Sequence, residues 1–247
     1  MPELLYDRDV PDSYKDRREH PENWYLFRIP GDEGIASGHV KRTAHAHAIG
    51  RLVLASRSDP FPVEIHLANA IHGVGVNPAP LAVVTETREP GPLWIAVEEA
   101  VEEARLDWYT RENTRFRMIR ALDAAVGEPD HPDGSYHSAN ACARLAAGVV
   151  SRPTLLKAFS IPDYPEEVED SEVPPDETCP IWRAAETAVD QARAAQDALD
   201  THLDTLRSAL TRAWSEDRDR SANAAARLVD GLISRPPVLR LLREAAS

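Results

Sequence analysis

An internal repeat constrains the fold of this chain more than any other feature of its sequence. Residues 92–126 align without a gap onto residues 180–214, which lie 88 positions further along. A second segment, residues 138–159, aligns onto residues 221–242, which lie 83 positions further along. Repeated units that each have one apolar face bury those faces by packing together. The repeat therefore predicts the architecture, but it leaves the chemistry undetermined.

Each copy has the pattern of a long helix, a short helix rich in small residues, and a further short helix that begins at a proline. In the first copy these helices are expected at 92–126, at 138–150 and from Pro153 onward. The long helix of the second copy has apolar residues three and four positions apart, typical of a helix that buries one stripe. This stripe consists of Val189, Ala192, Gln196, Leu199, Leu203, Leu206, Leu210 and Ala213. The sequence predicts a mainly α fold, in which repeated antiparallel helical hairpins form one pseudo-symmetric helical bundle with an irregular N-terminal unit.

Changes in composition divide the chain into five segments. They are an N-terminal arm with a short apolar run (1–36), a degenerate helical unit (37–91), a helical repeat (92–160), an acidic, proline-rich linker (161–179) and a second helical repeat (180–247). The apolar run at 23–29 is either a strand or an anchoring segment. In the second segment we expect helices over 37–56 and 63–74. If Asn69 corresponds to Asn140 of the repeat, this segment is a third copy.

The chain is acidic, which limits the classes of partner. It has 41 Asp and Glu against 28 Lys and Arg, a formal net charge of −13. Phosphate contacts need clustered cations, so we expect no nucleic acid and no membrane as a partner. An acidic surface suits a basic protein partner or serves solubility alone. Only three of the cations are lysine, and this preference for arginine is typical of GC-rich bacteria.

The remaining compositional features favour a cytoplasmic location. Cys142 and Cys179 occupy non-equivalent positions in the two copies, so they imply no disulfide framework. The polar N-terminal residues lack the apolar core of a signal peptide. No stretch approaches the roughly 18 consecutive apolar residues of a membrane span.

Polar residues that recur in both copies are candidates for a binding site. Asn140 and Arg144 lie four positions apart, so they share one helix face, and Asn223 and Arg227 are their equivalents. They form either a two-fold polar pocket or a structural network, with each Asn bonded to the backbone and each Arg to a carboxylate. We favour the structural network because both copies retain these residues.

Arg111 and Arg115 depart from the repeat, because the equivalent residues of the second copy are Leu199 and Leu203. Such departures tend to mark function or a surface that no longer faces the core. The two arginines are candidates for binding an anion or an acidic partner. Pairing with acidic residues of the chain is the favoured alternative.

The histidines in the second segment are candidates for metal ligands. Residues two positions apart on a helix point in different directions, so His45 and His47 are a poor pair on one helix. A site would need one histidine from each helix, for example His47 with His66, plus a carboxylate. Neither Glu-x-x-His nor His-Glu-x-x-His occurs, and we expect no metal or other cofactor.

A second candidate for a metal site is the loop that contains Asp130, His131 and His137. Carboxylate and imidazole ligands at these spacings could hold a divalent ion. Ordinary turn residues are the favoured alternative.

The chain has no P-loop, dinucleotide-binding, nucleophile-elbow or C-x-x-C motif. Repeated helical hairpins without such motifs most often build interaction surfaces. We therefore expect a soluble, non-enzymatic helical-repeat module that binds another protein, as an adaptor, an inhibitor or an immunity-type protein. The alternatives are a metal-binding protein or metal-dependent enzyme that uses the histidine-rich segment, and a structural subunit of a larger assembly. Formation of a homo-oligomer is compatible with all three.

Overall fold

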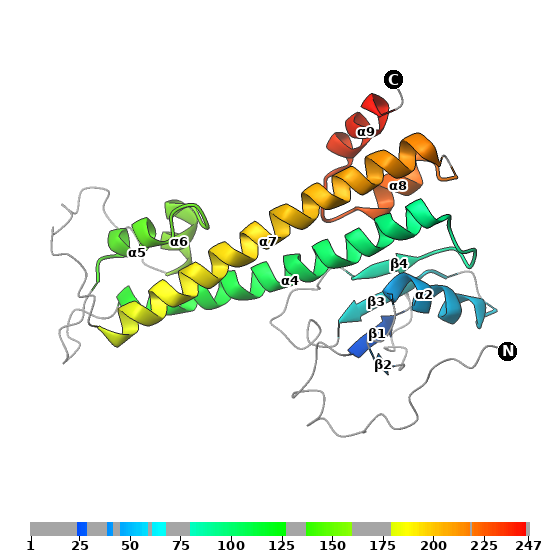
Figure 1. Ribbon diagram of the computed structural model, residues 1–247. Helices are drawn as coiled ribbons and strands as arrows, with labels where there is room; N and C mark the ends of the chain where they lie inside the picture. The colour runs from blue at the N-terminus through cyan, green and yellow to red at the C-terminus, as the bar shows by residue number, and fades with distance from the viewer. Residues whose placement is uncertain are drawn as a thin grey trace. The chain divides into compact units, whose positions relative to one another are not determined.

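The computed structural model describes residues 24–28, 39–41, 45–58, 61–67, 80–126, 137–159, 179–217 and 219–245. Within these residues the fold is mainly helical, with seven helices and four short strands (Figure 1). The strands are β1 (Trp24–Arg28), β2 (His39–Lys41), β3 (Val63–Leu67) and β4 (Ala82–Val84). The helices are α2 (Ala46–Ala55), α4 (Pro92–Val126), α5 (Ala139–Leu145), α6 (Arg152–Ala158), α7 (Pro180–Glu216), α8 (Ala222–Leu228) and α9 (Arg235–Glu244). None of these seven helices combines the length and the apolar character needed to cross a membrane.

The chain divides into two compact units. Unit 1 comprises residues 1–106 and 202–247, and unit 2 comprises residues 107–201. The long helices α4 and α7 each contribute one part to unit 1 and the other part to unit 2.

Unit 1 contains an antiparallel sheet with the strand order β2-β1-β3-β4, and α2 packs on β3 and β4 (Figure 1). In β3, Val63 and Ile65 are buried and the intervening Glu64 is partly exposed, which is the alternation of a strand. A Cβ atom on Gly50 of α2 would lie 2.4 Å from Cγ2 of Val84. Glycine at this position therefore lets α2 approach β4 closely, and this contact fixes the start of α2 above the sheet.

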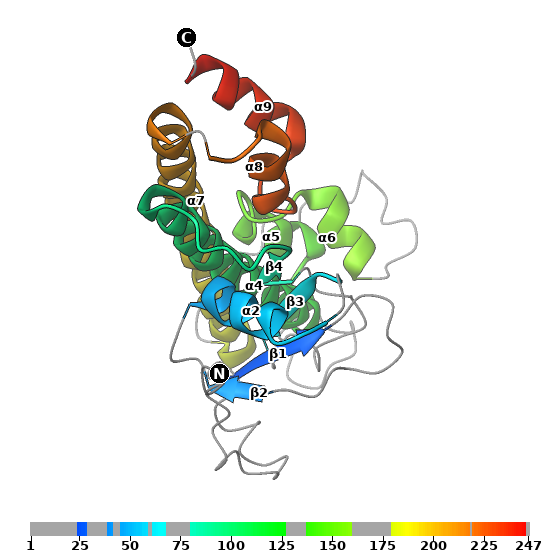
Figure 2. The ribbon, with the colours of Figure 1, turned by 90° about the vertical axis from the view of Figure 1, so that its right-hand side faces the viewer.

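A helical core completes unit 1. It combines the first part of α4 with the last part of α7, and α8 and α9 follow beside that part of α7 (Figure 2). Trp94, Leu206 and Leu210 are fully buried in this core. The indole N–H of Trp94 donates a hydrogen bond to the carbonyl oxygen of Asp217 at 2.9 Å, which satisfies the polar atom of a buried ring.

Unit 2 has a core of its own, formed by the last part of α4, by α5 and α6, and by the first part of α7. Met118, Leu122 and Leu155 are fully buried there. Cys142 is also buried in this core, and burial raises the pKa of its thiol to about 12.

The short helices of the two repeated segments begin in the same way. Ser138 and Ser221 are N-caps, and each side chain accepts a hydrogen bond from the backbone N–H three residues further on. Pro153 and Pro236 lie in the first turns of α6 and α9, where a missing N–H has no cost. These predicted caps and helix starts are confirmed.

The predicted long helices are confirmed as well. Helix α4 covers 92–126 and α7 covers 180–216, and the predicted apolar stripe of α7 is buried apart from Gln196 and Leu203, which are partly exposed. The helix predicted over 138–150 is shorter, because it ends at Leu145. Turns follow α5 and α8, and they contain Gly148 and Gly231 with φ angles of 88° and 81°. A residue in this left-handed conformation cannot continue a right-handed helix, and it favours glycine.

The helices predicted over 37–56 and 63–74 are wrong in part. Residues 39–41 form β2, α2 begins only at Ala46, and residues 63–67 form β3. The reason is local, because Val63 and Ile65 are β-branched and alternate with polar residues, which favours a strand. The apolar run at 23–29 contains β1, so it forms a strand. Asn69 lies outside the described residues.

Candidate functional site

The start of α2 brings two histidines together in unit 1. The helix begins at Ala46, and His45 precedes it as the N-cap residue with φ −58° and ψ 130°, a non-helical conformation. His45 therefore leaves the helical path, and its ring is free to point toward the same place as that of His47. The expectation that these two histidines make a poor pair assumed that both are helical, and that assumption is wrong.

Glu102 of α4 meets this helix start. Its Oε2 accepts a hydrogen bond from the backbone N–H of Ala46, and its Oε1 accepts one from the N–H of His47, both at 3.0 Å. A carboxylate satisfies otherwise unpaired donors at a helix N-terminus and interacts favourably with the helix dipole. Glu102 thus ties α2 to α4 across 56 residues of sequence.

Both imidazoles also converge on Glu102. Nδ1 of His45 lies 2.8 Å from Oε1 of Glu102, and Nδ1 of His47 lies 2.5 Å from the same oxygen. One ligand atom from each of the three residues lies within 4.8 Å of the other two. His47 and Glu102 are buried, and the His45 side chain is 16% exposed. The three side chains therefore form a compact, largely dry group with two nitrogen donors and one carboxylate.

One ring nitrogen of His45 is an exception to the usual satisfaction of buried polar atoms. Both nitrogens are buried, but Nδ1 pairs with Oε1 of Glu102 at 2.8 Å, whereas Nε2 has no hydrogen-bond partner among the described residues. A buried polar atom without a partner in a native structure calls for an explanation, such as a bound water or ion.

The close contacts within this group shift the pKa values of Glu102 and His45. Burial alone would raise the pKa of Glu102, but its contacts with His45 and His47 and their charges lower it to about 2. Burial alone would lower the pKa of His45, but Glu102, Glu98 and Glu99 outweigh burial and raise it above its ordinary value. The carboxylate is therefore negatively charged at neutral pH, whereas the raised pKa of His45 favours its protonated form, which must lose its proton to bind a metal.

One turn before Glu102, a second buried carboxylate lies between two arginines. Oε2 of Glu98 accepts a hydrogen bond from Arg51 at 2.8 Å, and Oε1 accepts one from Arg220 at 2.6 Å. The guanidinium of Arg220 also lies over the ring of Trp94, 5.3 Å from its centroid. These contacts hold both guanidinium groups in fixed positions.

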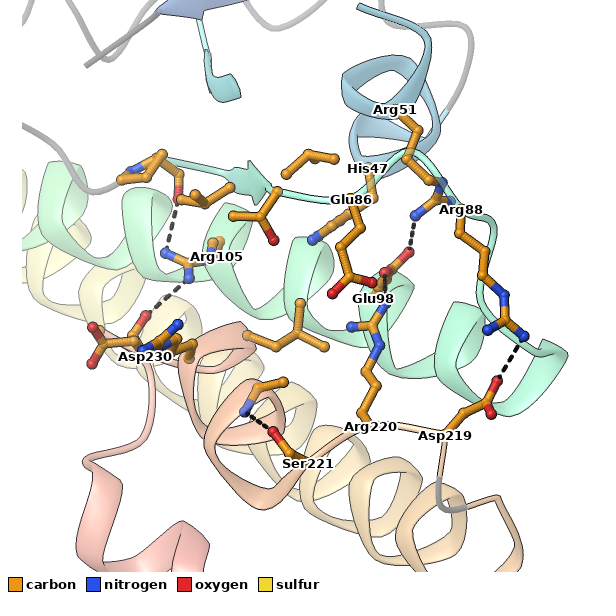
Figure 3. Close-up of a pocket in the computed structure, with 18 residues that line it drawn as sticks. His47, Arg51, Glu86, Arg88, Glu98, Arg105, Asp219, Arg220, Ser221 and Asp230 are labelled. Carbon is orange, nitrogen blue, oxygen red and sulfur yellow. Dashed lines mark hydrogen bonds and ion pairs between the residues drawn. The ribbon is translucent and has the colours of Figure 1, made fainter. Parts of the chain in front are cut away.

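A pocket of about 560 Å³ opens beside these residues (Figure 3). It is lined by His47, Arg51, Pro80, Val83, Val84, Thr85, Glu86, Arg88, Glu98, Arg105, Asp219, Arg220, Ser221, Ala224, Arg227, Leu228, Asp230 and Gly231. Figure 3 shows Arg51 reaching down from α2 and Arg220 reaching up from the opposite wall, with Glu98 between them. Every lining residue belongs to unit 1, and His47 belongs both to the pocket and to the histidine–glutamate group.

Arg105 forms another wall of the pocket. Its two terminal nitrogens donate hydrogen bonds to the carbonyl oxygens of Pro80 at 2.8 Å and Asp230 at 2.9 Å. These bonds connect the loop before β4, helix α4 and the turn after α8, and so they fix the shape of the pocket.

The binding-site candidates predicted from the repeat do not come together in one site in the structure. Arg227 lines the pocket, whereas Asn223 is outside it and accepts a hydrogen bond from Arg235 at 2.8 Å. In the other copy Asn140 accepts one from Arg152 at 3.0 Å. Asn140 is partly exposed and Asn223 is exposed. Their side chains thus link the starts of consecutive short helices, and the expected bonds to backbone groups at a close helix crossing are replaced by these bonds to arginine.

The other predicted residues lie away from this pocket. Arg111 pairs with Glu112, the next residue along α4, and neither Arg111 nor Arg115 lines the pocket. Arg144 is exposed in the last turn of α5 and is not a lining residue either.

The predicted pairing of His47 with His66 is replaced by that of His47 with His45. His66 is buried in β3, where its Nε2 lies 3.3 Å from Oε2 of Glu64. His137 is buried in unit 2 against the ring of Trp182. Asp130 and His131 lie outside the described residues.

Sequence reasoning missed Glu98 and Glu102. The sequence feature that points to them is their spacing. Residues four positions apart lie on one helix face, and these two are adjacent in sequence to the buried Val97 and Val101. Acidic residues at the edge of an apolar stripe must be paired if they are buried. Their partners, however, lie in distant segments that the sequence does not identify.

Comparison of the chain with protein-family models, with curated proteins and with solved structures finds no significant match. The geometry of the site is therefore the basis for proposing a function.

Proposed function

We propose that unit 1 binds a divalent transition-metal ion through His45, His47 and Glu102. The observation that carries this proposal is the convergence of two imidazole nitrogens, 2.8 and 2.5 Å away, on one carboxylate oxygen. Two histidines and a carboxylate are a ligand set typical of Zn²⁺ and Fe²⁺. The sequence favours a protein without a metal, whereas this geometry favours the alternative of a metal-binding protein.

The spacing of the three ligand atoms supports an ion between them. Bonds from a metal to imidazole nitrogen or carboxylate oxygen are about 2.0–2.2 Å long, so neighbouring ligand atoms lie roughly 3 Å apart. All three atoms already lie within 4.8 Å of one another, so small side-chain rotations suffice.

Three protein ligands leave a coordination position open. Closed structural zinc sites have four protein ligands, whereas catalytic sites have three and keep a position for water or substrate. His47 lies at the wall of the pocket, which supports access from the pocket to that position. A metal-dependent binding or catalytic role of unit 1 follows from this proposal.

Elemental analysis of protein saturated with Zn²⁺ and then freed of excess ion tests the site. Glu102→Gln is the decisive variant, because the amide keeps the size and one of the two acceptor oxygens that cap α2 but is a poor ligand. Glu103→Gln is the matched control, since Glu103 is the next residue of α4 and is exposed. We expect about one zinc per chain in the wild type and in Glu103→Gln, and far less than one in Glu102→Gln, because loss of a ligand weakens binding.

Two outcomes would contradict the metal proposal. One is zinc retention by Glu102→Gln equal to that of the control. The other is a wild-type protein, folded by circular dichroism, that retains no zinc, iron or manganese after exposure to each ion.

A second candidate function is the binding of a basic protein, favoured by the net charge of −13 and by the repeated helices.

We propose that α4–α6 and α7–α9 are two copies of one unit. Similar contacts between the copies support this duplication. Arg105 of the first copy donates a hydrogen bond to the carbonyl oxygen of Asp230 in the second, and its equivalent Arg193 donates one at 2.6 Å to the carbonyl oxygen of Leu145 in the first, two positions from the counterpart of Asp230. The equivalent pairs Asn140–Arg152 and Asn223–Arg235, and the left-handed Gly148 and Gly231, support it further.

Affinity capture from a bacterial lysate, with a charge-reduced variant beside the wild type, tests this second function. Asp190 and Asp204 of α7 have side chains that are each 76% exposed, so Asp190→Asn with Asp204→Asn removes surface charge without touching a core. We expect a basic protein to be captured by the wild type at low salt, released at high salt, and captured less by the variant. Equal capture by both proteins at all salt concentrations would contradict the acidic-surface interpretation.

A further inference from the structure

The pocket beside His47 has a distinctive charge pattern. Five arginines and four carboxylates line it, in a chain whose formal net charge is −13. One of the carboxylates, Glu98, is already bonded to two of the arginines. The pocket is thus an arginine-rich recess in an acidic protein, and it contains one of the metal ligands proposed above.

We infer that this pocket binds a small oxyanionic ligand, a phosphate or a carboxylate, whose oxygen reaches the open position of the ion held by His45, His47 and Glu102. This inference rests on the proposed metal site. Oxyanions are suitable ligands for an open position on Zn²⁺ or Fe²⁺, and guanidinium groups recognise the same class of ligand by charge-assisted hydrogen bonds.

Arg227 is the arginine best placed to receive the ligand. Arg105 is buried, and both of its terminal nitrogens already donate hydrogen bonds to carbonyl oxygens, so it adds positive charge to the wall of the pocket. Arg227 is exposed in the last turn of α8 and forms no ion pair with another described residue. The ion pairs of Arg51 and Arg220 with Glu98 make those two guanidinium groups part of the pocket's fixed frame.

The acidic residues of the pocket limit the ligand to a small one. Glu86, Asp219 and Asp230 line it together with the arginines, so a polyanion would meet carboxylates as well as cations. The net negative charge of the whole chain also repels a polyanion. A single phosphate or carboxylate group, in contrast, needs only one or two arginines and the ion.

Calorimetric titration of the zinc-loaded protein tests the inference, with inorganic phosphate as one probe and succinate as the other. The two probes separate a phosphate site from a carboxylate site. The test variant is Arg227→Ala. Its matched control is Arg144→Ala, because Arg144 is the counterpart of Arg227 in the repeat, is also exposed in the last turn of a short helix, and is not a lining residue.

We expect one of the two probes to bind the zinc-loaded wild type and Arg144→Ala with equal affinity. Loss of one charge-assisted hydrogen bond in Arg227→Ala should weaken that binding by about tenfold or more. Zinc content should be unchanged in both variants, so a failure of this inference differs from a failure of the metal site. The inference is overturned if neither probe binds zinc-loaded protein, if both arginine variants bind alike, or if the metal-free protein binds the probe as tightly as the loaded protein.

Discussion

At the residue scale, two carboxylates on one face of α4 distinguish this protein. Glu98 bonds to two arginines, and Glu102 meets two histidines and the start of α2. The sequence indicates neither role, because both residues belong to an acidic stretch that resembles a solvated helix face. Their partners on α2 lie 47 to 56 residues away along the chain, so only the tertiary fold reveals them.

Glu98→Gln should destabilise the protein strongly. It removes the charge that compensates Arg51 and Arg220, whose side chains are 10% and 20% exposed. Breaking a buried ion pair from one side costs about 3 kcal/mol or more, because the remaining charge stays desolvated. Urea unfolding of Glu98→Gln beside Glu99→Gln measures the effect, since Glu99 is the exposed neighbour in the same helix. The control should change the free energy of unfolding by less than about 0.5 kcal/mol, and equal effects of the two variants would contradict the buried ion pair.

At the element scale, the close contact between α2 and β4 places His45 and His47 within reach of Glu102. The contact depends on Gly50, where a Cβ atom would lie 2.4 Å from Cγ2 of Val84. Any change that pushes α2 away from the sheet also moves its first turn, which contains the two histidines.

Gly50→Ala should therefore destabilise unit 1 by about 1–3 kcal/mol through overpacking. Val84→Ala should relieve the clash, so the double variant should be more stable than the sum of the single changes in unfolding free energy predicts. Thermal or urea unfolding of the wild type, the two single variants and the double variant measures the coupling free energy between Gly50→Ala and Val84→Ala. Strictly additive effects would show that Gly50 and Val84 are not in contact.

The elements that sequence reasoning predicted are those with long periodic patterns. Helices α4 and α7 are long enough for their apolar period to exclude a strand, and the serine caps and prolines mark the ends of the short helices. The sequence predicts a helix where the structure has β3, because five residues are too few for the period of their apolar positions to be decisive. The helix predicted over 37–56 covers the short strand β2 and places the helix start before His45, and so it hides the pairing of His45 with His47.

At the scale of the whole molecule, the repeated segments do not coincide with the two units. The core of unit 1 uses the first part of α4 and the last part of α7, and the core of unit 2 uses the other part of each helix. Each core therefore combines residues from both repeated segments, and this is why the alignment of the repeat predicts the helices better than it predicts the compact units.

Cys142 gives a direct probe of unit 2. The residue is fully buried, and its thiol pKa is raised to about 12, so the reactive thiolate forms only at strongly alkaline pH while the core is intact. We expect no alkylation of Cys142 by iodoacetamide in the native protein at neutral pH and complete alkylation in concentrated urea. Peptide mass spectrometry measures both. Native alkylation at the rate of a free cysteine would contradict the core assigned to unit 2.

An anomalous difference map from crystals of the Zn²⁺-loaded protein, with data collected on both sides of the zinc absorption edge, tests the claim that His45, His47 and Glu102 hold a metal ion. A single zinc peak should lie between Nδ1 of His45, Nδ1 of His47 and the carboxylate of Glu102, at about 2.0–2.2 Å from each. A zinc-loaded crystal in which this position has no peak, with Oε1 of Glu102 still in direct contact with both imidazoles, would contradict the claim.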